Sequence, residues 1–424
     1  MNLPFFIAKR INNRSDRNSA ISNTSGRIAV FSVAISLALI IVSISISSGF
    51  RKEIVEKSVG FCGNMWLGAP GLELYNTLYP VELSDNTIGV IKNENYIKNI
   101  QAVCYTMGLF KTDEQIEGVI FKGIDSLYNM DFYKKHLVEG NLPKYSNTLS
   151  NEILISKRMK DILEYSVGDK VDAYFVSNNV TIRRFKIVGV YDAQLEDVDK
   201  LLVITDINHV RKINKWTGSM VSGYELFLKD GYSNNLRFKN KITNIIERSL
   251  QKSNDSDSLE AGAESSLMVS TIEEQFYTLF DWLHLIDINV LIILTLMIAV
   301  AGFNMLSGLL IMLFERIAQI GLFKALGMSN KNVVKIFLYS AALIVVKGMI
   351  IGNLFAFLIC FVQWKFEFIK LNPANYFVEH VPIYLTWYNV LLVNLISFVA
   401  IMLVLMLPSH FISKISPAKT LVLK

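Results

Sequence analysis

The sequence predicts a membrane protein with four transmembrane helices and a large α+β domain inserted between the first and the second. Of its 424 residues 52% are hydrophobic, and the mean hydropathy is +0.36, which is too apolar for an ordinary soluble protein. The 19% of charged residues is too high for a chain that lies wholly in a bilayer. Apolar windows long enough to cross a bilayer predict four spans, at 28–48, 285–314, 337–362 and 385–407.

The basic residues predict how these spans are oriented. Lys and Arg dominate residues 1–27, 315–336 and 408–424, whereas the segment 51–284 carries 27 Lys and Arg against 32 Asp and Glu. Positive charge stays on the cytoplasmic side of a membrane. We therefore expect both termini in the cytoplasm and the domain 49–284, with the loop 363–384, outside. The net charge of +5 reflects this topology and does not indicate nucleic-acid binding, since no basic face with interleaved aromatic residues is present.

The first residues combine an amphipathic patch, LPFFIAKRI, with a polar basic run. The patch is typical of a helix that lies in the membrane interface. The span 28–48 is rich in serine and alanine, and small residues of this kind allow transmembrane helices to pack closely.

The segment 49–284 alternates in the manner of strands, with a few helical stretches. Ser84 is expected to begin a helix that runs to Asn99, and Thr271 to begin one that continues through Trp282 into the second span. The remaining predicted helices are 156–164 and 235–250, and the predicted strands are 101–110, 116–123, 152–155, 170–176, 180–191, 201–204 and 224–228.

Candidate chemical groups are sparse. Cys62 and Cys104 fit either a disulfide or two buried thiols. The five histidines lack paired zinc spacing, and no glycine-rich phosphate loop is present. We therefore expect no metal, no catalytic residues and no cofactor on this chain, so that any energy source belongs to a partner. Lys347, near the centre of the third predicted span, either lines a wet cavity or extends its ammonium toward the interface.

The charged segment 315–336, ERIAQIGLFKALGMSNKNVVKI, separates the second and third spans and forms a predicted elbow. Gly327 is a candidate helix C-cap, and Ser329 a candidate N-cap of the next helix. An apolar face suits a groove on another protein, although packing against the chain's own helices is the alternative. The residues of this face are Ile317, Ile320, Leu322 and Leu326.

Several motifs occur in an order that resembles the permease subunits of the FtsX/MacB/Lol superfamily of ABC transporters. They are FFIAKR, SGFRKEI, FKGID, VGDKV, RRFKIVGVYDAQ, FNMLSGLLIMLFERIAQIGLFKALGMSNKNVVKIF and ISPAKTL. The large outer domain and the LTW and SPAKTL segments make the pattern most similar to lipoprotein-releasing (LolC/LolE-like) permeases, with a MacB-like periplasmic core.

The resemblance implies an inner-membrane, multi-pass subunit that pairs with a second permease, identical or not, and with a cytoplasmic ABC ATPase that binds ATP and Mg²⁺. The substrate implied is a lipoprotein, and recruitment of a periplasmic carrier is left open because the turn at 177–181 is short. The implied ATPase-coupling residues are Glu315, Arg316, Gln319, Ile320, Gly321, Lys324, Ala325, Leu326, Gly327 and Met328.

The resemblance also points to a cavity for lipid chains between the first and second spans. Its candidate lining residues are Phe50, Met297, Phe303, Asn304 and Met305, for which helix packing is the competing role. Two other functions fit the same superfamily: an FtsX-like mechanical regulator of a periplasmic partner, and a MacB-like efflux component without lipoprotein transport.

Overall fold

The computed structural model divides into two compact units. The helical unit comprises Met1–Lys52, Trp282–Lys370 and His380–Lys424, and the sheet unit comprises Glu53–Asp281 and Leu371–Glu379. The structure describes residues 3–13, 20–69, 79–112, 115–146, 148–176, 180–229, 236–254, 267–315 and 317–413.

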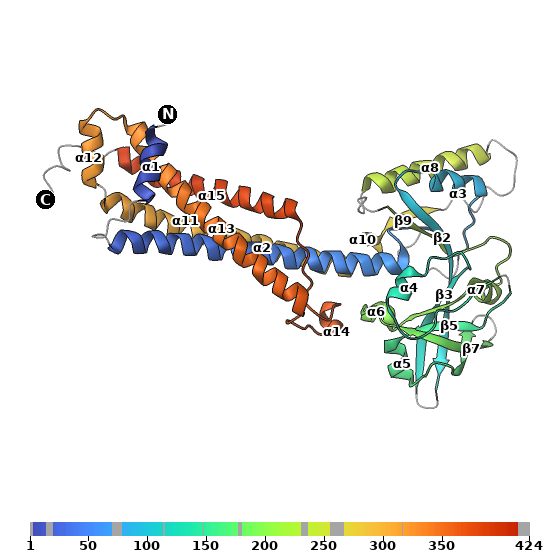
Figure 1. The fold of residues 1–424 in the computed structure, drawn as a ribbon. Coiled ribbons are helices and arrows are strands. Elements are labelled where there is room, and N and C mark those ends of the chain that lie inside the picture. The colour runs from blue at the N-terminus through green and yellow to red at the C-terminus, as the bar shows by residue number, and fades with distance from the viewer. Residues whose placement is uncertain are drawn as a thin grey trace. The chain divides into compact units, whose positions relative to one another are not determined.

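Four helices in the described residues are long and apolar enough to cross a membrane. Each of the four predicted spans falls on one of them. They are α2 (Ala20–Cys62), α11 (Tyr277–Glu315), α13 (Asn330–Phe366) and α15 (Trp387–Ser413), and they run alongside one another in Figure 1.

Small residues bring α2 and α13 close together. Gly348 and Gly352 lie one turn apart on α13, and their missing side chains leave room for the backbone of α2. A Cβ atom built on Gly352 would lie 2.6 Å from the carbonyl oxygen of Ala34, nearer than real Cβ contacts allow. This is the small-xxx-small packing that membrane helices use in place of a hydrophobic driving force.

Replacing Gly352 with leucine is therefore expected to lower the free energy of unfolding by about 1–3 kcal/mol, because the contact is overpacked. Thermal unfolding of the detergent-solubilised chain measures the effect. Gly26→Ala is the matched control on α2, since a Cβ atom there meets nothing within 4 Å. Equal melting temperatures for Gly352→Leu and the wild type would show that α2 and α13 are not in tight contact.

Polar side chains join α2 to α11 at two positions along the helices. Asn304 on α11 donates from Nδ2 to Ser32 Oγ at 2.6 Å. Farther along, Asp287 accepts from Ser47 Oγ at 2.7 Å and pairs with Arg51 at 2.5 Å. The amphipathic patch near the start of the chain forms α1 (Leu3–Asn13), which packs on α13.

A mixed ten-stranded sheet forms the described core of the sheet unit, in the order β10-β1-β9-β2-β3-β8-β5-β7-β4, with β6 pairing β2 and β7. The strands are β1 (Met65–Gly68), β2 (Ile97–Lys111), β3 (Ile116–Ile124), β4 (Leu137–Gly140), β5 (Glu152–Ser156), β6 (Lys170–Val176), β7 (Val180–Tyr191), β8 (Leu202–Asp206), β9 (Gly223–Leu228) and β10 (Met268–Thr271).

Six of these strands close on themselves. Consecutive pairings join β2 to β3, β3 to β8, β8 to β5, β5 to β7, β7 to β6 and β6 back to β2. Aromatic side chains pack in the core of this circuit, with Phe121 stacked on Phe185 at a centroid distance of 5.4 Å and Phe175 beside both. Closure removes free strand edges, which otherwise promote aggregation.

Short helices connect the strands, and two of them begin at the expected caps, Ser84 and Thr271. Ser84, Ser156 and Thr271 each accept a hydrogen bond from a backbone N–H of the first turn. The helices are α3 (Asp85–Lys92), α4 (Asp131–Lys135), α5 (Lys157–Leu163), α6 (Glu196–Asp199), α7 (Ile207–Asn214), α8 (Leu236–Asn254), α10 (Ile272–Gln275) and α14 (Pro373–Tyr376).

Two predicted helices are wrong in extent. The helix expected to end at Asn99 stops at Lys92, because residues from Ile97 onward pair with β9 as part of β2. The helix from Thr271 is interrupted at Phe276, whose backbone leaves the helical region at ψ 43°, and α11 begins afresh at Tyr277. Tertiary strand pairing overrides local helical propensity in the first case.

Candidate functional site

The predicted elbow is a separate short helix, α12 (Ile317–Ala325), between two candidate spans. It ends in a Schellman motif, in which Met328 donates from N to Phe323 O at 3.0 Å and Gly327 donates to Lys324 O at 3.0 Å. Gly327 has φ +88°, a conformation that disfavours a side chain. Both the expected cap at Gly327 and the new helix start after Ser329 are confirmed, although the Ser329 side chain makes no capping bond.

The expected apolar face of this elbow is divided between two surroundings. Ile320 is fully buried and packs against Val333 and Phe337 of α13, so it stabilises the elbow itself. Leu322 and Leu326 remain 53% and 76% exposed. With Gln319, which is also exposed, they follow the spacing of one helical face. We call Gln319, Leu322 and Leu326 the elbow face.

The other implied coupling residues surround this face. Ala325 and Gly327 are exposed, Lys324 and Met328 are half-buried, and Gly321 is buried. Arg316 and the side chain of Glu315 lie outside the described part of the structure. A docking role for all of these residues stays a prediction.

The five residues predicted to line a lipid cavity do not gather around one cavity of the described chain. Phe50 is buried with its ring edge-on to Trp282, at a centroid distance of 6.0 Å. Met305 is buried in the helix core, and Asn304 bonds Ser32. Phe303 is 68% exposed, and Met297 is half-buried.

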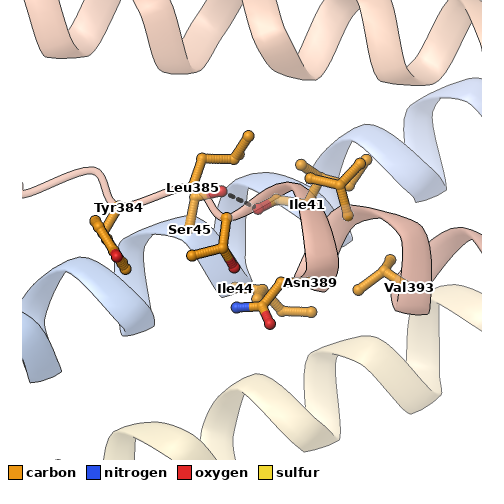
Figure 2. Close-up of a pocket in the computed structure, with 9 residues that line it drawn as sticks. Ile41, Ile44, Ser45, Tyr384, Leu385, Asn389 and Val393 are labelled. Atoms are coloured by element: carbon orange, nitrogen blue, oxygen red, sulfur yellow. Dashed lines mark hydrogen bonds between the residues drawn. The ribbon is translucent and has the colours of Figure 1, made fainter. Parts of the chain in front are cut away.

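Two enclosed spaces between the described helices are small. Figure 2 shows one beside Ser45 of α2, lined by Tyr384, Leu385 and the start of α15, with a volume of about 10 Å³. A second space beside Met297 is equally small. A space of this size holds at most one water molecule and cannot accept an acyl chain. A larger groove of about 440 Å³ lies between α13 and α15, with a reciprocal Asn353–Asn394 hydrogen-bond pair among its lining residues.

Lys347 lies near the middle of α13. Its neighbour Gly348 packs against Val30 and Val33 of α2. The side chain of Lys347 is exposed. The choice between a wet cavity and an ammonium group that extends toward the interface stays a prediction.

A buried ion pair joins the end of α2 to the sheet. Lys122 and Glu225 are both 0% exposed, with 2.6 Å between Nζ and Oε1. Lys122 also donates to the carbonyl oxygen of Phe61, in the last turn of α2, at 2.5 Å and to Tyr128 Oη at 2.9 Å. Glu225 accepts from Tyr128 Oη at 2.8 Å. We call this group the α2 joint. Its bonds anchor a helix terminus through an orphan carbonyl.

The sheet unit also contains a charged cleft of about 250 Å³. Its lining residues are Lys157, Arg158, Asp161, Asp192, Gln194, Glu196, Asp199, Asn372, Pro373, Ala374 and Glu379. Asp199 is buried, and its Oδ1 atom has no hydrogen-bond partner. Burial, reinforced by the nearby charge of Asp192, raises the pKa of Asp199 to about 7. No group of three or more potential metal ligands occurs in the described residues.

Asp199 is therefore expected to make stability pH-dependent. The pKa of Asp199 is higher in the folded protein than the usual 3.8 of the unfolded chain. Its protonated form therefore stabilises the fold below pH 3.8, and this stabilisation is lost as the pH rises to about 7. The loss amounts to at most about 4 kcal/mol. Asp199→Asn removes the ionisation, so the melting temperature of this variant relative to the wild type should rise between pH 4 and pH 8. Melting temperatures across this range test it, with exposed Asp197→Asn as the control; a constant difference would contradict the assignment.

The two cysteines of the sheet unit, Cys62 and Cys104, are free and buried. Of the two alternatives, a disulfide or two buried thiols, the structure has the second. The α2 joint and the charged cleft were not predicted. Their members are distant in sequence and carry no shared motif, although Lys122 lies in the FKGID segment.

Comparison with known proteins identifies both units. Residues 28–233 match the MacB-like periplasmic core domain, and residues 291–417 match the FtsX-like permease C-terminal domain. The chain belongs to the FtsX/MacB/Lol superfamily of ABC-transporter permeases.

This permease is similar along nearly its whole length to two curated relatives. It is 24% identical to the lipoprotein-releasing system transmembrane protein LolC of Neisseria meningitidis serogroup B, over 96% of each chain. It is 21% identical to the lipoprotein-releasing system transmembrane protein LolE of Haemophilus influenzae, over 99% of each chain. Among solved structures, the periplasmic region of MacB from Actinobacillus actinomycetemcomitans is 16% identical with a TM-score of 0.34, covering 53% of this chain and 96% of that one. A TM-score of that size marks only a weak likeness in shape.

Proposed function

We propose that this chain is the permease subunit of a transporter that releases lipoproteins from the inner membrane. A separate ABC ATPase binds and hydrolyses ATP with Mg²⁺, and the permease is non-catalytic by itself. The full-length similarity to proteins named as lipoprotein-releasing supports this substrate class. The chain supplies no phosphate-binding loop of its own.

The elbow face is the observation that supports coupling to a separate ATPase. Leu322 and Leu326 project from a helix that is capped at Gly327 and held to α13 by buried Ile320. A rigid helix that exposes two leucines one turn apart suits an apolar groove on a partner. Because α12 lies between α11 and α13 in the chain, a force on the elbow acts on both helices.

A second permease subunit accounts for the exposed surface of α11. Only 11% of its most apolar window is buried, against 50% for the corresponding window of α2. Phe303 lies on this open surface. The lipid-chain site then forms between two subunits, with Phe303 and Met297 facing it, whereas Asn304, Met305 and Phe50 support the helices. An identical or a related second permease satisfies this arrangement.

The proposed orientation places the elbow and both termini in the cytoplasm and the sheet unit in the periplasm. The basic residues near the elbow and termini support it. A lipoprotein extracted from the outer leaflet then leaves on the periplasmic side, where a carrier protein receives it.

Depletion of the permease in its host tests this function. Outer-membrane lipoproteins should accumulate in the inner membrane, as measured by fractionation and blotting. A defect in cell separation alone would identify a mechanical regulator instead, and a change in drug or toxin sensitivity alone would identify an efflux component; both results contradict lipoprotein release.

A further inference from the structure

Lys57 of α2 is a buried lysine that holds two separate loops of the sheet unit. Its side chain is only 3% exposed. Its Nζ donates to Gln194 Oε1 at 2.9 Å and to the carbonyl oxygen of Phe377 at 2.8 Å. Gln194 precedes α6, and Phe377 ends α14 in the segment 371–379, which we call the finger.

Both loops are held in an uncommon backbone conformation at the residue that Lys57 contacts. Gln194 and Phe377 each have φ +61°, in the left-handed region. A residue with a Cβ atom rarely adopts this region unless its surroundings impose it. The two hydrogen bonds from one ammonium group supply such a constraint.

Charge reinforces this contact. The two hydrogen-bond acceptors of Lys57 are neutral, and a buried ammonium group needs negative charge nearby. Glu53, Asp192, Asp199 and, from the finger itself, Glu379 lie within electrostatic reach. The finger is thus held to Lys57 by the Phe377 carbonyl, and the charge of Glu379 adds a weaker attraction.

Packing alone does not fix the finger. Val378 is buried, and Phe377 packs partly against the sheet core. Residues 372–374, however, line the charged cleft of about 250 Å³ rather than a close-packed surface. That side of the finger faces the cleft and gains little dispersion attraction from the protein, so packing holds it only weakly.

The finger is also tied to the end of α13. Its neck, within the helical unit, is closed by a bridge between Lys370 and His380 and by a bond from Val381 N to Ile369 O at 3.1 Å. Gln363, in the last turn of α13, bonds the backbone of both Ile369 and Val381. The chain therefore runs from the elbow along α13, through this closed neck, to the finger and Lys57.

We infer that Lys57 is a positioning residue that latches the finger to the sheet unit, so that displacement of α13 by the elbow reaches the outer domain by this second route. The first route is the direct chain connection through α11. This inference rests on the proposed function for its role in transport, whereas the latch itself is a property of the fold.

The test uses the full permease assembled with its ATPase in nanodiscs. In Lys57→Met, hydrogen exchange of the peptide covering 371–379 should be at least about tenfold faster than in the wild type. ATP hydrolysis should continue at the wild-type rate while lipoprotein release per ATP falls at least about fivefold. A loss of folding alone would lower both rates together, so the ratio separates latching from structural damage.

Two variants keep the test decisive. Lys200→Met, an exposed lysine at the end of α6 near Gln194, should match the wild type in both measurements. Lys57→Met combined with Asp199→Asn removes the ammonium together with a carboxylate that it neutralises, and should show the same release defect in a folded protein.

Unchanged exchange of the finger in both Lys57 variants would overturn the latch. Faster exchange with unchanged release per ATP would overturn the transmission role. If the wild-type complex itself releases no lipoprotein, the proposed function fails, and the exchange measurement still decides the latch.

Discussion

Replacing Lys122 with alanine is expected to lower the free energy of unfolding of the sheet unit by about 3–5 kcal/mol, the usual cost of breaking a buried ion pair on one side. Glu225 would then be buried without its cation, and the Phe61 carbonyl would lose a donor. Hydrogen exchange of the β3 and β9 amides, together with thermal unfolding of the solubilised chain, measures the loss.

The control is Lys186→Ala on β7, an exposed position where a change within about 0.5 kcal/mol is expected. Lys122→Met combined with Glu225→Leu removes both charges, and should cost less than the sum of the single changes. Additive costs, or a Lys122→Ala variant as stable as the control, would show that the α2 joint contributes nothing.

Replacing Leu326 with aspartate is expected to weaken ATPase binding by roughly 30-fold or more, because removing an apolar side chain from the centre of an interface costs about 2 kcal/mol. The side chain is 76% exposed, so the substitution leaves the packing of the elbow intact. Titration of the purified permease with the ATPase in detergent gives the dissociation constants of the wild type and of Leu326→Asp.

Ser329→Ala is the matched control beside the elbow, since Ser329 is exposed and its side chain makes no capping bond. It should bind the ATPase as the wild type does. An unchanged dissociation constant for both Leu326→Asp and Leu322→Asp would move the docking surface away from the elbow face.

Local signals predicted much of the fold. Alternation predicted β6 and β7 with their observed bounds in the described residues. The caps at Ser84 and Thr271 depend on a side-chain oxygen, and the cap at Gly327 depends on the absence of a side chain; both effects act within one turn. The four-residue strands β1, β4 and β10 were missed, because so short a segment carries no measurable periodicity.

Features that depend on contacts distant in sequence could not be predicted. Periodicity grouped Ile320 with Leu322 and Leu326, but it does not reveal which neighbour covers a face, and Ile320 turns onto α13. The Lys122–Glu225 pair depends on strands that meet only in the folded sheet.

Reconstituted release of a triacylated lipoprotein tests the central claim most directly. Proteoliposomes containing the permease, its partner permease and the ATPase would be loaded with a labelled lipoprotein, and the label transferred to a soluble acceptor would be counted with and without ATP. We expect transfer that requires ATP hydrolysis and is abolished by Leu326→Asp in the permease. Steady ATP hydrolysis without transfer, or transfer that proceeds equally without ATP, would contradict it.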